Sequence, residues 1–322
     1  MMKANRIVSL IFATVLLGTA QAQAETVGIG TTKGGATAQV SAGISIIVSS
    51  HAGMQMRPRP MGGTAQYVPV VNAGELEFGV SNAMQAYMDF TGTGMSQGKK
   101  SPNLRLVASL MTFKSGLFAK ADSGIRTIAD LKGKRVPGEF SGAPLFKYLF
   151  EANLANAELG WNDVTMIPQA GLRQHWDAFT KGKLDVGLAA IGSGIVKKIN
   201  AAVGGIVFLD LSTDEAAVKR MNKFAPKASI RTVNPAKPFV GVLAPIDVIH
   251  FKYLLWANKD VSDKVIYAVV KALYDNEEQI HGLSPLWRSH KSAAMATQFG
   301  KEMPYHPAAV KFYKEVGIWK GM

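Results

Sequence analysis

Short apolar runs alternate with stretches of helical periodicity along the first part of this chain. Runs with the length of buried strands occupy Thr26–Gly30 and Leu76–Val80, and apolar residues recur at helical spacing from Ala38 to about Ser49. Two further apolar runs, Leu104–Met111 and Gly116–Lys120, predict central strands. Strands that alternate with helices in this way predict a mostly parallel sheet with helices on its faces.

The alternation restarts after residue 121. Strand-like runs at Val164–Ile167 and Leu184–Ala190 enclose a helical pattern over Leu172–Lys181, and Pro144–Leu154 forms another apolar helical run. Phe251–Ala257 has the pattern of a strand that returns to the first unit. The pattern therefore predicts an α/β protein of two lobes, each a mostly parallel sheet flanked by helices, between which the chain crosses more than once.

The length of the chain agrees with two lobes, since domains commonly have about 150 residues. We assign residues 25–120 and 245–322 to lobe 1, and residues 121–244 to lobe 2. Small ligands bind in the cleft between such lobes, outside the carboxyl ends of the strands. A ligand cleft between the two lobes is therefore expected.

Residues 1–24 have the pattern of a cleaved signal peptide. Lys3 and Arg6 precede the apolar run Ile7–Leu17, and Ala22-Gln23-Ala24 is a cleavage site of the A-x-A type. The apolar run is too short for a bilayer, which requires about 20 residues. We therefore expect a mature chain that starts at Glu25 and is located in the periplasm.

Composition narrows the chemistry. The chain has no cysteine, which excludes disulfides, cysteine-bound zinc and thiol catalysis. Its 36 Lys and Arg residues outnumber 23 Asp and Glu residues, for a formal net charge of +13. Such a surface favours acidic solutes, or it suits a compartment bordered by anionic lipid. The basic residues are scattered and the chain is expected to be exported, so we expect no nucleic-acid partner, and we expect a monomer.

The motifs of common enzymes are incomplete. Ser193 lies between a predicted strand and a predicted helix, but its surroundings lack the G-x-S-x-G spacing of a nucleophile elbow. The six histidines include no H-x-x-x-H pair, so no metal is expected, and Lys33 stands where a dinucleotide fingerprint needs its third glycine. An enzyme remains the alternative hypothesis, with Ser193, His175 and Asp185 as its candidate group. The leading expectation is a protein that is not an enzyme and has no cofactor.

Polar groups instead gather where predicted loops meet predicted helices. Hydroxyls and free backbone N–H groups at such joints suit the capture of a carboxylate, and Arg173 adds a guanidinium that can hold one by two hydrogen bonds. Each residue could equally be an ordinary helix cap. The candidate polar and glycine residues are Thr31, Thr32, Thr37, Thr64, Asn82, Gln85, Ser141, Gly142, Ala143, Gln169, Arg173 and Gly192.

The mature chain resembles the TAXI group of solute receptors, which serve TRAP-type secondary transporters. The matching segments include Gly28–Gly35, Gly62–Asn82, Ala121–Val136 and His306–Gly317. The resemblance implies a two-lobed binding protein of the type II class, which closes around a small organic anion and delivers it to a membrane TRAP permease. Known ligands of the group include glutamate-like and 2-oxo-dicarboxylate compounds. A ligand-sensing role for a signalling partner is the other alternative.

Two departures from the group bear on the ligand. Ala36-Thr37-Ala38-Gln39 stands where family members usually carry aromatic residues, and Asn82 replaces a common acid that could pair with a ligand ammonium. Asn82 therefore favours a carboxylate without an amino group. Phe113 and Phe140, together with Trp176 and Phe239, either line the cleft and favour an aromatic or apolar acid, or belong to the core.

Overall fold

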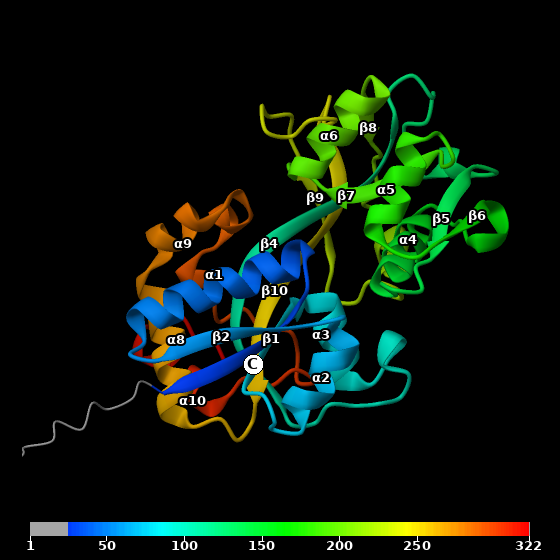
Figure 1. Ribbon diagram of the computed structural model, residues 1–322. Helices are drawn as coiled ribbons and strands as arrows, with labels where there is room; N and C mark the ends of the chain where they lie inside the picture. Colours follow the sequence, from blue (N-terminus) through cyan, green and yellow to red (C-terminus); the bar gives the residue numbers. More distant parts are fainter. Residues whose placement is uncertain (1–24, 322) are drawn as a thin grey trace, which may run out of the picture.

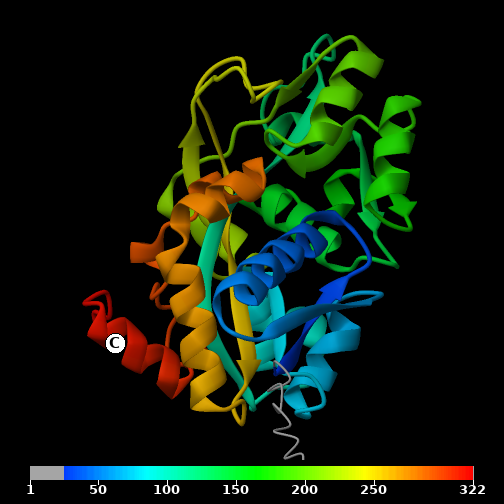
Figure 2. The same cartoon turned by 60° about the vertical axis from the view of Figure 1, so that its left-hand side comes forward.

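Two long strands join the two lobes of the molecule (Figure 1). The computed structural model describes residues 25–321, and the expected signal peptide, residues 1–24, lies outside the described residues. β4 (Leu104–Lys120) and β10 (Ile246–Asn258) pair antiparallel and extend together from lobe 1 into lobe 2, as the turned view in Figure 2 also shows. We call the stretch where they pass between the lobes the hinge.

The sheet of lobe 1 is mixed. Its order is β2-β1-β3-β10-β4, where β1 pairs parallel with both β2 and β3, and β10 pairs antiparallel with β3 and β4. The expected parallel arrangement therefore holds for the first three strands, and β10 reverses it because the chain re-enters lobe 1 from lobe 2. The first three strands are β1 (Thr26–Thr32), β2 (Gln55–Met61) and β3 (Phe78–Asn82).

Helices cover this sheet. α1 buries Val40, Ile44, Ile47 and Val48, whose spacing places them on one side of the helix, and it packs on β1, α8 and α9. The helices of lobe 1 are α1 (Gly35–His51), α2 (Thr64–Asn72), α3 (Ala83–Thr91), α8 (Asp263–Asp275), α9 (Glu277–Leu283) and α10 (Pro307–Glu315), with the 3₁₀ turns η1 (Gly94–Ser96), η4 (Pro285–Ser289) and η5 (Ser292–Ala294). No helix within residues 25–321 is long and apolar enough to cross a membrane.

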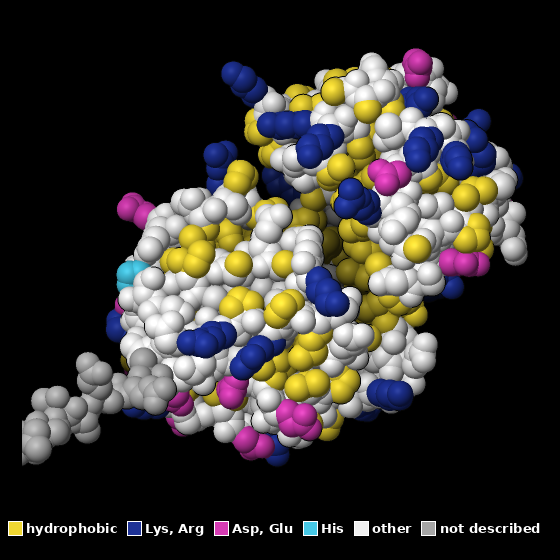
Figure 3. Space-filling model, viewed as in Figure 1, with side chains coloured by type: hydrophobic (Ala, Val, Ile, Leu, Met, Phe, Trp, Pro, Cys, Tyr) yellow, Lys and Arg dark blue, Asp and Glu magenta, His cyan; other side chains and the backbone are white. Residues whose placement is uncertain are grey.

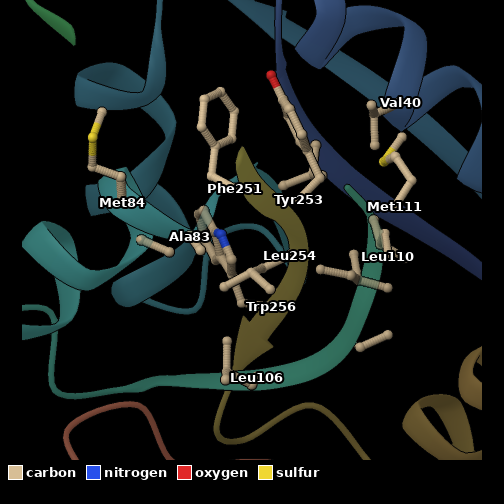
Figure 4. Close-up of a cluster of buried hydrophobic side chains, with 14 of the residues drawn as sticks. Val40, Ala83, Met84, Leu106, Leu110, Met111, Phe251, Tyr253, Leu254 and Trp256 are labelled. Atoms are coloured by element: carbon tan, nitrogen blue, oxygen red, sulfur yellow. The ribbon is translucent and has the colours of Figure 1, made fainter. Parts of the chain in front are cut away.

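One aromatic side chain anchors β10 in the core of lobe 1. The Trp256 indole is fully buried, stacks on Tyr67 with ring centroids 6.0 Å apart, and donates its N–H to Ser81 Oγ at 3.1 Å. Gly79 lies directly opposite Trp256 in the register, which leaves room for the indole. Figure 4 shows Trp256 among Leu254, Leu106 and neighbouring side chains of this core.

Lobe 2 is built around the far ends of β4 and β10. β7 and β8 pair antiparallel with β4, β9 pairs antiparallel with β10, and β5 and β6 form a separate parallel pair. Phe118, Phe179 and Phe208 pack edge to face in its core. The remaining elements are β5 (Arg135–Glu139), α4 (Leu145–Asn156), β6 (Thr165–Gln169), α5 (Leu172–Thr180), β7 (Val186–Ala190), α6 (Gly194–Val203), β8 (Ile206–Phe208), α7 (Glu215–Asn222), β9 (Ser229–Val233), η2 (Ala129–Leu131) and η3 (Trp161–Asp163).

Candidate functional site

The surface is hollowed between the two lobes, and apolar side chains line much of the hollow (Figure 3). β1 leads directly into α1, and the N-terminal end of α1 points toward lobe 2 (Figure 1). We therefore examined the start of α1, the hinge strands beside it and the starts of the helices in lobe 2.

The start of α1 carries no side-chain cap from any described residue. Gly34, its N-cap residue, is extended and exposed, and α1 continues for 17 residues, so unpaired N–H groups and the positive end of a long helix dipole face outward there. Thr32 Oγ1 donates to the carbonyl of Gly34 at 2.8 Å and fixes the loop. This end of α1 has the charge and the donors to hold a small anion.

A chain of hydroxyl groups continues from this helix end to the hinge. Ser41 Oγ donates to Thr31 Oγ1 at 2.7 Å, and Thr31 Oγ1 donates to the carbonyl of Thr37 at 3.3 Å. Thr37 Oγ1 in turn lies 3.3 Å from the hydroxyl of Tyr253 on β10. Thr31 is buried and its hydroxyl is already engaged, so half-buried Thr37 is the member placed to meet a ligand, with the buried Tyr253 hydroxyl directly behind it.

Sequence reasoning missed Tyr253, which belongs to an aromatic cluster on the hinge. Phe113 of β4 stacks on Phe251 of β10 at 5.4 Å and tilts against Tyr253 at 5.7 Å, while Figure 4 shows Phe251 and Tyr253 projecting from β10. Phe251 and Tyr253 are buried and Phe113 is partly exposed. Burial raises the pKa of Tyr253, so its hydroxyl stays protonated and can donate.

Asn82 and Gln85 make a local helix cap, whereas Thr64 makes no side-chain hydrogen bond with the described residues. Asn82 Oδ1 accepts the N–H of Gln85 at 2.9 Å and thereby caps α3, and both residues are buried. Thr64 begins α2, but no described side chain caps that helix, whose N-cap residue is Gly63. For Asn82 the ordinary cap interpretation accounts for its contacts.

The loop at 141–143 differs from expectation. Its backbone N–H groups were expected to be free for an anion, but those of Ser141, Gly142 and Ala143 donate to the carbonyls of Gln169, Ala170 and Phe140 at 3.3, 2.9 and 2.8 Å. The loop thereby extends the pairing of β5 with β6, and its donors are consumed.

Phe140 also serves the core of lobe 2 in this conformation. Its ring is fully buried, stacks on Phe150 at 5.7 Å, and meets the His175 ring edge to face at the same distance. Its backbone has a φ of 50°, in the left-handed region that favours glycine. The buried ring cannot contact a ligand here, and it holds the turn that precedes α4.

The starts of α5 and α6 remain open toward ligand binding. Gly171, the N-cap residue of α5, has no side-chain cap from the described residues, and Arg173 is exposed in the first turn of α5. Gln169 Nε2 makes a long bond of 3.4 Å to the carbonyl of Ile167. Gly192, with a φ of 83°, lies under the Phe239 ring at the turn into α6. Arg173 and Gln169 therefore remain candidates.

The side chains proposed for an enzyme are engaged separately. His175 Nε2 accepts the N–H of Leu188 at 3.1 Å, and burial lowers the pKa of His175 to about 4. The carboxylate of Asp185 accepts from the Arg135 guanidinium at 2.6 and 3.1 Å and from the Arg135 N–H at 2.8 Å, which lowers the pKa of Asp185. Neither group is hydrogen-bonded to Ser193, so the geometry offers no activated nucleophile of this kind.

Two surface cavities lie away from this region. One of about 430 Å³ in lobe 2 is lined by Glu158, Asp210, Asp214 and Arg220, and one of about 390 Å³ lies beside Arg59, Glu75 and Glu77 in lobe 1. Carboxylates outnumber guanidinium groups in both linings, so neither cavity suits an anion. The open wall formed by the start of α1 and the hinge is the stronger candidate.

Solved structures that resemble this chain share little of its sequence. PhnD1 of Prochlorococcus marinus (MIT 9301), in complex with methylphosphonate, has a TM-score of 0.55 at 9% identity, over 91% of this chain and 99% of that one. XAC2383 of Xanthomonas citri, bound to ATP, has a TM-score of 0.51 at 9% identity, over 92% and 97%. The aliphatic sulphonate binding protein SsuA of Escherichia coli has a TM-score of 0.48 at 15% identity, over 90% and 83%.

These likenesses establish the fold, which is the two-lobed fold of periplasmic binding proteins. Relationship by sequence comes from a family model, which matches residues 29–317 and so covers nearly all of the described chain. The protein is therefore a member of the NMT1-like family.

Proposed function

We propose that the protein is an extracytoplasmic solute-binding protein that captures a small organic anion, in our view a carboxylate, between its lobes. The observation that carries this proposal is the uncapped start of α1 beside the Thr37–Tyr253 hydroxyl pair. That arrangement places N–H donors, two hydroxyls and a helix dipole next to an aromatic surface. A carboxylate at the helix end with an apolar body over Phe113 satisfies both chemistries.

A thermal-shift screen of carboxylates, on protein refolded to remove carried ligand, tests the proposal. A ligand that binds only the folded protein raises its melting temperature. Tyr253→Phe removes the hydroxyl and should weaken the best ligand about fivefold to tenfold, as expected for one lost hydrogen bond worth about 1 kcal/mol. Tyr267→Phe is the matched control, because the Tyr267 hydroxyl binds Glu315 on an exposed surface.

A broad carboxylate panel that gives no shift would overturn the proposed ligand class. If Tyr253→Phe and Tyr267→Phe weaken ligand binding equally, the proposal that the ligand binds at the start of α1 is refuted. Arg173→Ala separates the second hypothesis: a loss of roughly 2–4 kcal/mol in binding identifies Arg173 as a clamp from lobe 2, since a guanidinium binds a carboxylate with two hydrogen bonds. Unchanged affinity would assign the anion to helix ends and hydroxyls alone.

We further propose that the bound anion is delivered to a membrane transporter of the TRAP type, as the TAXI resemblance implies. The fold itself does not favour this class, because binding proteins of ABC transporters share it. Uptake of the ligand, measured in cells that carry the transporter, distinguishes a TRAP transporter from an ABC transporter. Dependence on an ion gradient would support TRAP, whereas direct dependence on ATP with the gradient collapsed would assign an ABC transporter.

A further inference from the structure

The hinge strands have two chemically different faces. Phe113 lies opposite Phe251 in the register, and Lys114 lies opposite His250. Because successive residues of a strand point to opposite faces, the face behind the aromatic cluster carries Lys114, His250 and Lys252. Arg231 of β9 pairs with Val248, two residues from His250, and so joins the same face. We call these four residues the hinge cluster.

The cations of the hinge cluster are not neutralised by neighbouring acids. Within residues 25–321, none of Lys114, Arg231 and Lys252 takes part in a salt bridge. Asp247 occupies an opposite-face position and accepts from the Thr232 hydroxyl at 2.6 Å. Lys114, Arg231 and Lys252 therefore carry positive charges that no salt bridge within residues 25–321 neutralises, while Asp247 acts only on the pKa of His250.

Acids on the adjacent elements are also engaged elsewhere. Glu277 of α9 bonds Lys291 at 3.0 Å and the N–H of Ser292 at 2.7 Å. Glu277 therefore pairs within lobe 1 and forms no salt bridge with Lys114, Arg231 or Lys252.

Burial and mutual repulsion make this arrangement unfavourable in the absence of an anion. Lys252 is half-buried, and burial followed by the charge of Arg231 lowers its pKa. Burial is the main cause that lowers the pKa of His250, and Lys114 and Arg231 lower it further, against the bond to the Val248 carbonyl and the charge of Asp247, which raise it. The Lys114 ammonium is held 4.5 Å above the Phe239 ring. Like charges that share one face of the hinge strands and are partly desolvated favour a bound anion.

The hinge cluster lies between parts of both lobes. Thr112, opposite Lys252, bonds Ser289 of η4 in lobe 1 through both its N–H and its carbonyl at 3.0 Å. Phe239 and Arg231 belong to lobe 2. Figure 3 shows dark blue side chains beside the notch between the α9 side of lobe 1 and lobe 2.

We propose that the hinge cluster is a second anion site, which binds a small polyvalent oxyanion of the phosphate, pyrophosphate or sulfate kind. A single carboxylate neutralises only one of the cations, whereas a polyvalent oxyanion presents several charged oxygens to Lys114, Arg231 and Lys252 together. The site is separate from the start of α1, because it lies on the reverse face of the hinge strands.

Calorimetric titration of the full mature protein with pyrophosphate, phosphate and sulfate, at ionic strength held constant with chloride, tests the proposal. Saturable one-site binding is expected, tightest for pyrophosphate. Lys252→Gln and Arg231→Gln should each weaken it at least tenfold, and Lys252→Gln should raise the melting temperature of the anion-free protein because it relieves repulsion. Lys219→Gln, which removes one exposed charge from α7, is the matched control.

Absence of saturable binding above chloride would overturn the second site. Equal weakening by Lys219→Gln and Lys252→Gln would also overturn it, since it would indicate attraction to the net charge alone. Exposed Arg231 keeps the test valid if Lys252→Gln unfolds the protein. Carboxylate binding measured on the same variants should be unchanged, so failure at this site and failure of the proposed function give different results.

Discussion

Gly79→Ala tests how β10 is anchored in lobe 1. A Cβ at Gly79 would lie 2.2, 2.4 and 2.7 Å from Cη2, Cζ3 and Cζ2 of the Trp256 indole, all of them atoms of its six-membered ring. The φ of Gly79 lies outside the left-handed region, so alanine strains no backbone there and would ordinarily stabilise a strand slightly. The contact with Trp256 predicts the opposite sign.

The size of the expected destabilisation follows from the packing and the hydrogen bond that the indole would lose. Overpacking of a filled core costs about 1–3 kcal/mol, and loss of the bond to Ser81 adds about 1 kcal/mol, so Gly79→Ala should lower the free energy of unfolding by about 2–4 kcal/mol. Trp256→Phe removes the ring atoms that the new Cβ meets and should cost about 2 kcal/mol alone. In that background, Gly79→Ala should cost about 1–2 kcal/mol less than in the wild type.

Urea unfolding, followed in parallel by circular dichroism and fluorescence, measures all four corners of this cycle. An unchanged dependence on urea concentration shows that a midpoint shift reports stability. If Gly79→Ala has the same cost in both backgrounds, the contact between the new Cβ and the indole does not determine the effect, and the packing argument is refuted.

Variants at three further positions test other parts of the structure. Burial raises the pKa of Asp89 to about 7, so its contribution to stability should be lost as pH rises from about 4 to 7, and unfolding titrations should find that Asp89→Asn removes this loss. Burial lowers the pKa of His175 to about 4, so stability should fall as pH drops from about 6.5 to 4, and less so in His175→Gln by the same titrations. Arg220 donates to the carbonyls of Ala155 and Asn156 at the end of α4, so thermal unfolding should find Arg220→Ala less stable by about 1–2 kcal/mol, with Arg220→Lys recovering less than half.

Local pattern predicted most elements but not the continuity of the hinge strands. Leu104–Met111 and Gly116–Lys120 are both apolar, and the intervening Thr112–Ser115 suggested a gap between two strands. The structure instead has one strand from Leu104 to Lys120. The polar residues fall where β4 passes between the lobes, and one of them, Lys114, belongs to the hinge cluster. A strand that carries polar residues where it passes between two lobes therefore has the sequence pattern of a loop.

The surroundings of the candidate site residues were predictable only where their contact partners are close in sequence. Thr31, Thr32 and Thr37 lie together because β1 leads directly into α1. The backbone N–H groups of Ser141 and Gly142 donate to the carbonyls of residues 169 and 170. These partners are distant in sequence, so no local pattern predicts the hydrogen bonds. Tyr253 was missed because its hydroxyl partner, Thr37, is also distant in sequence. The aromatic residues at alternate positions, Phe251 and Tyr253, were the sequence feature that could have indicated it.

β10 is the last strand of lobe 1 in the sequence and one of its central strands in space, between β3 and β4. During synthesis, both neighbours must wait with unpaired edges until more than a hundred further residues have emerged, and the whole of lobe 2 is made in that interval. Such non-local pairing slows folding and leaves exposed edges open to association with other chains.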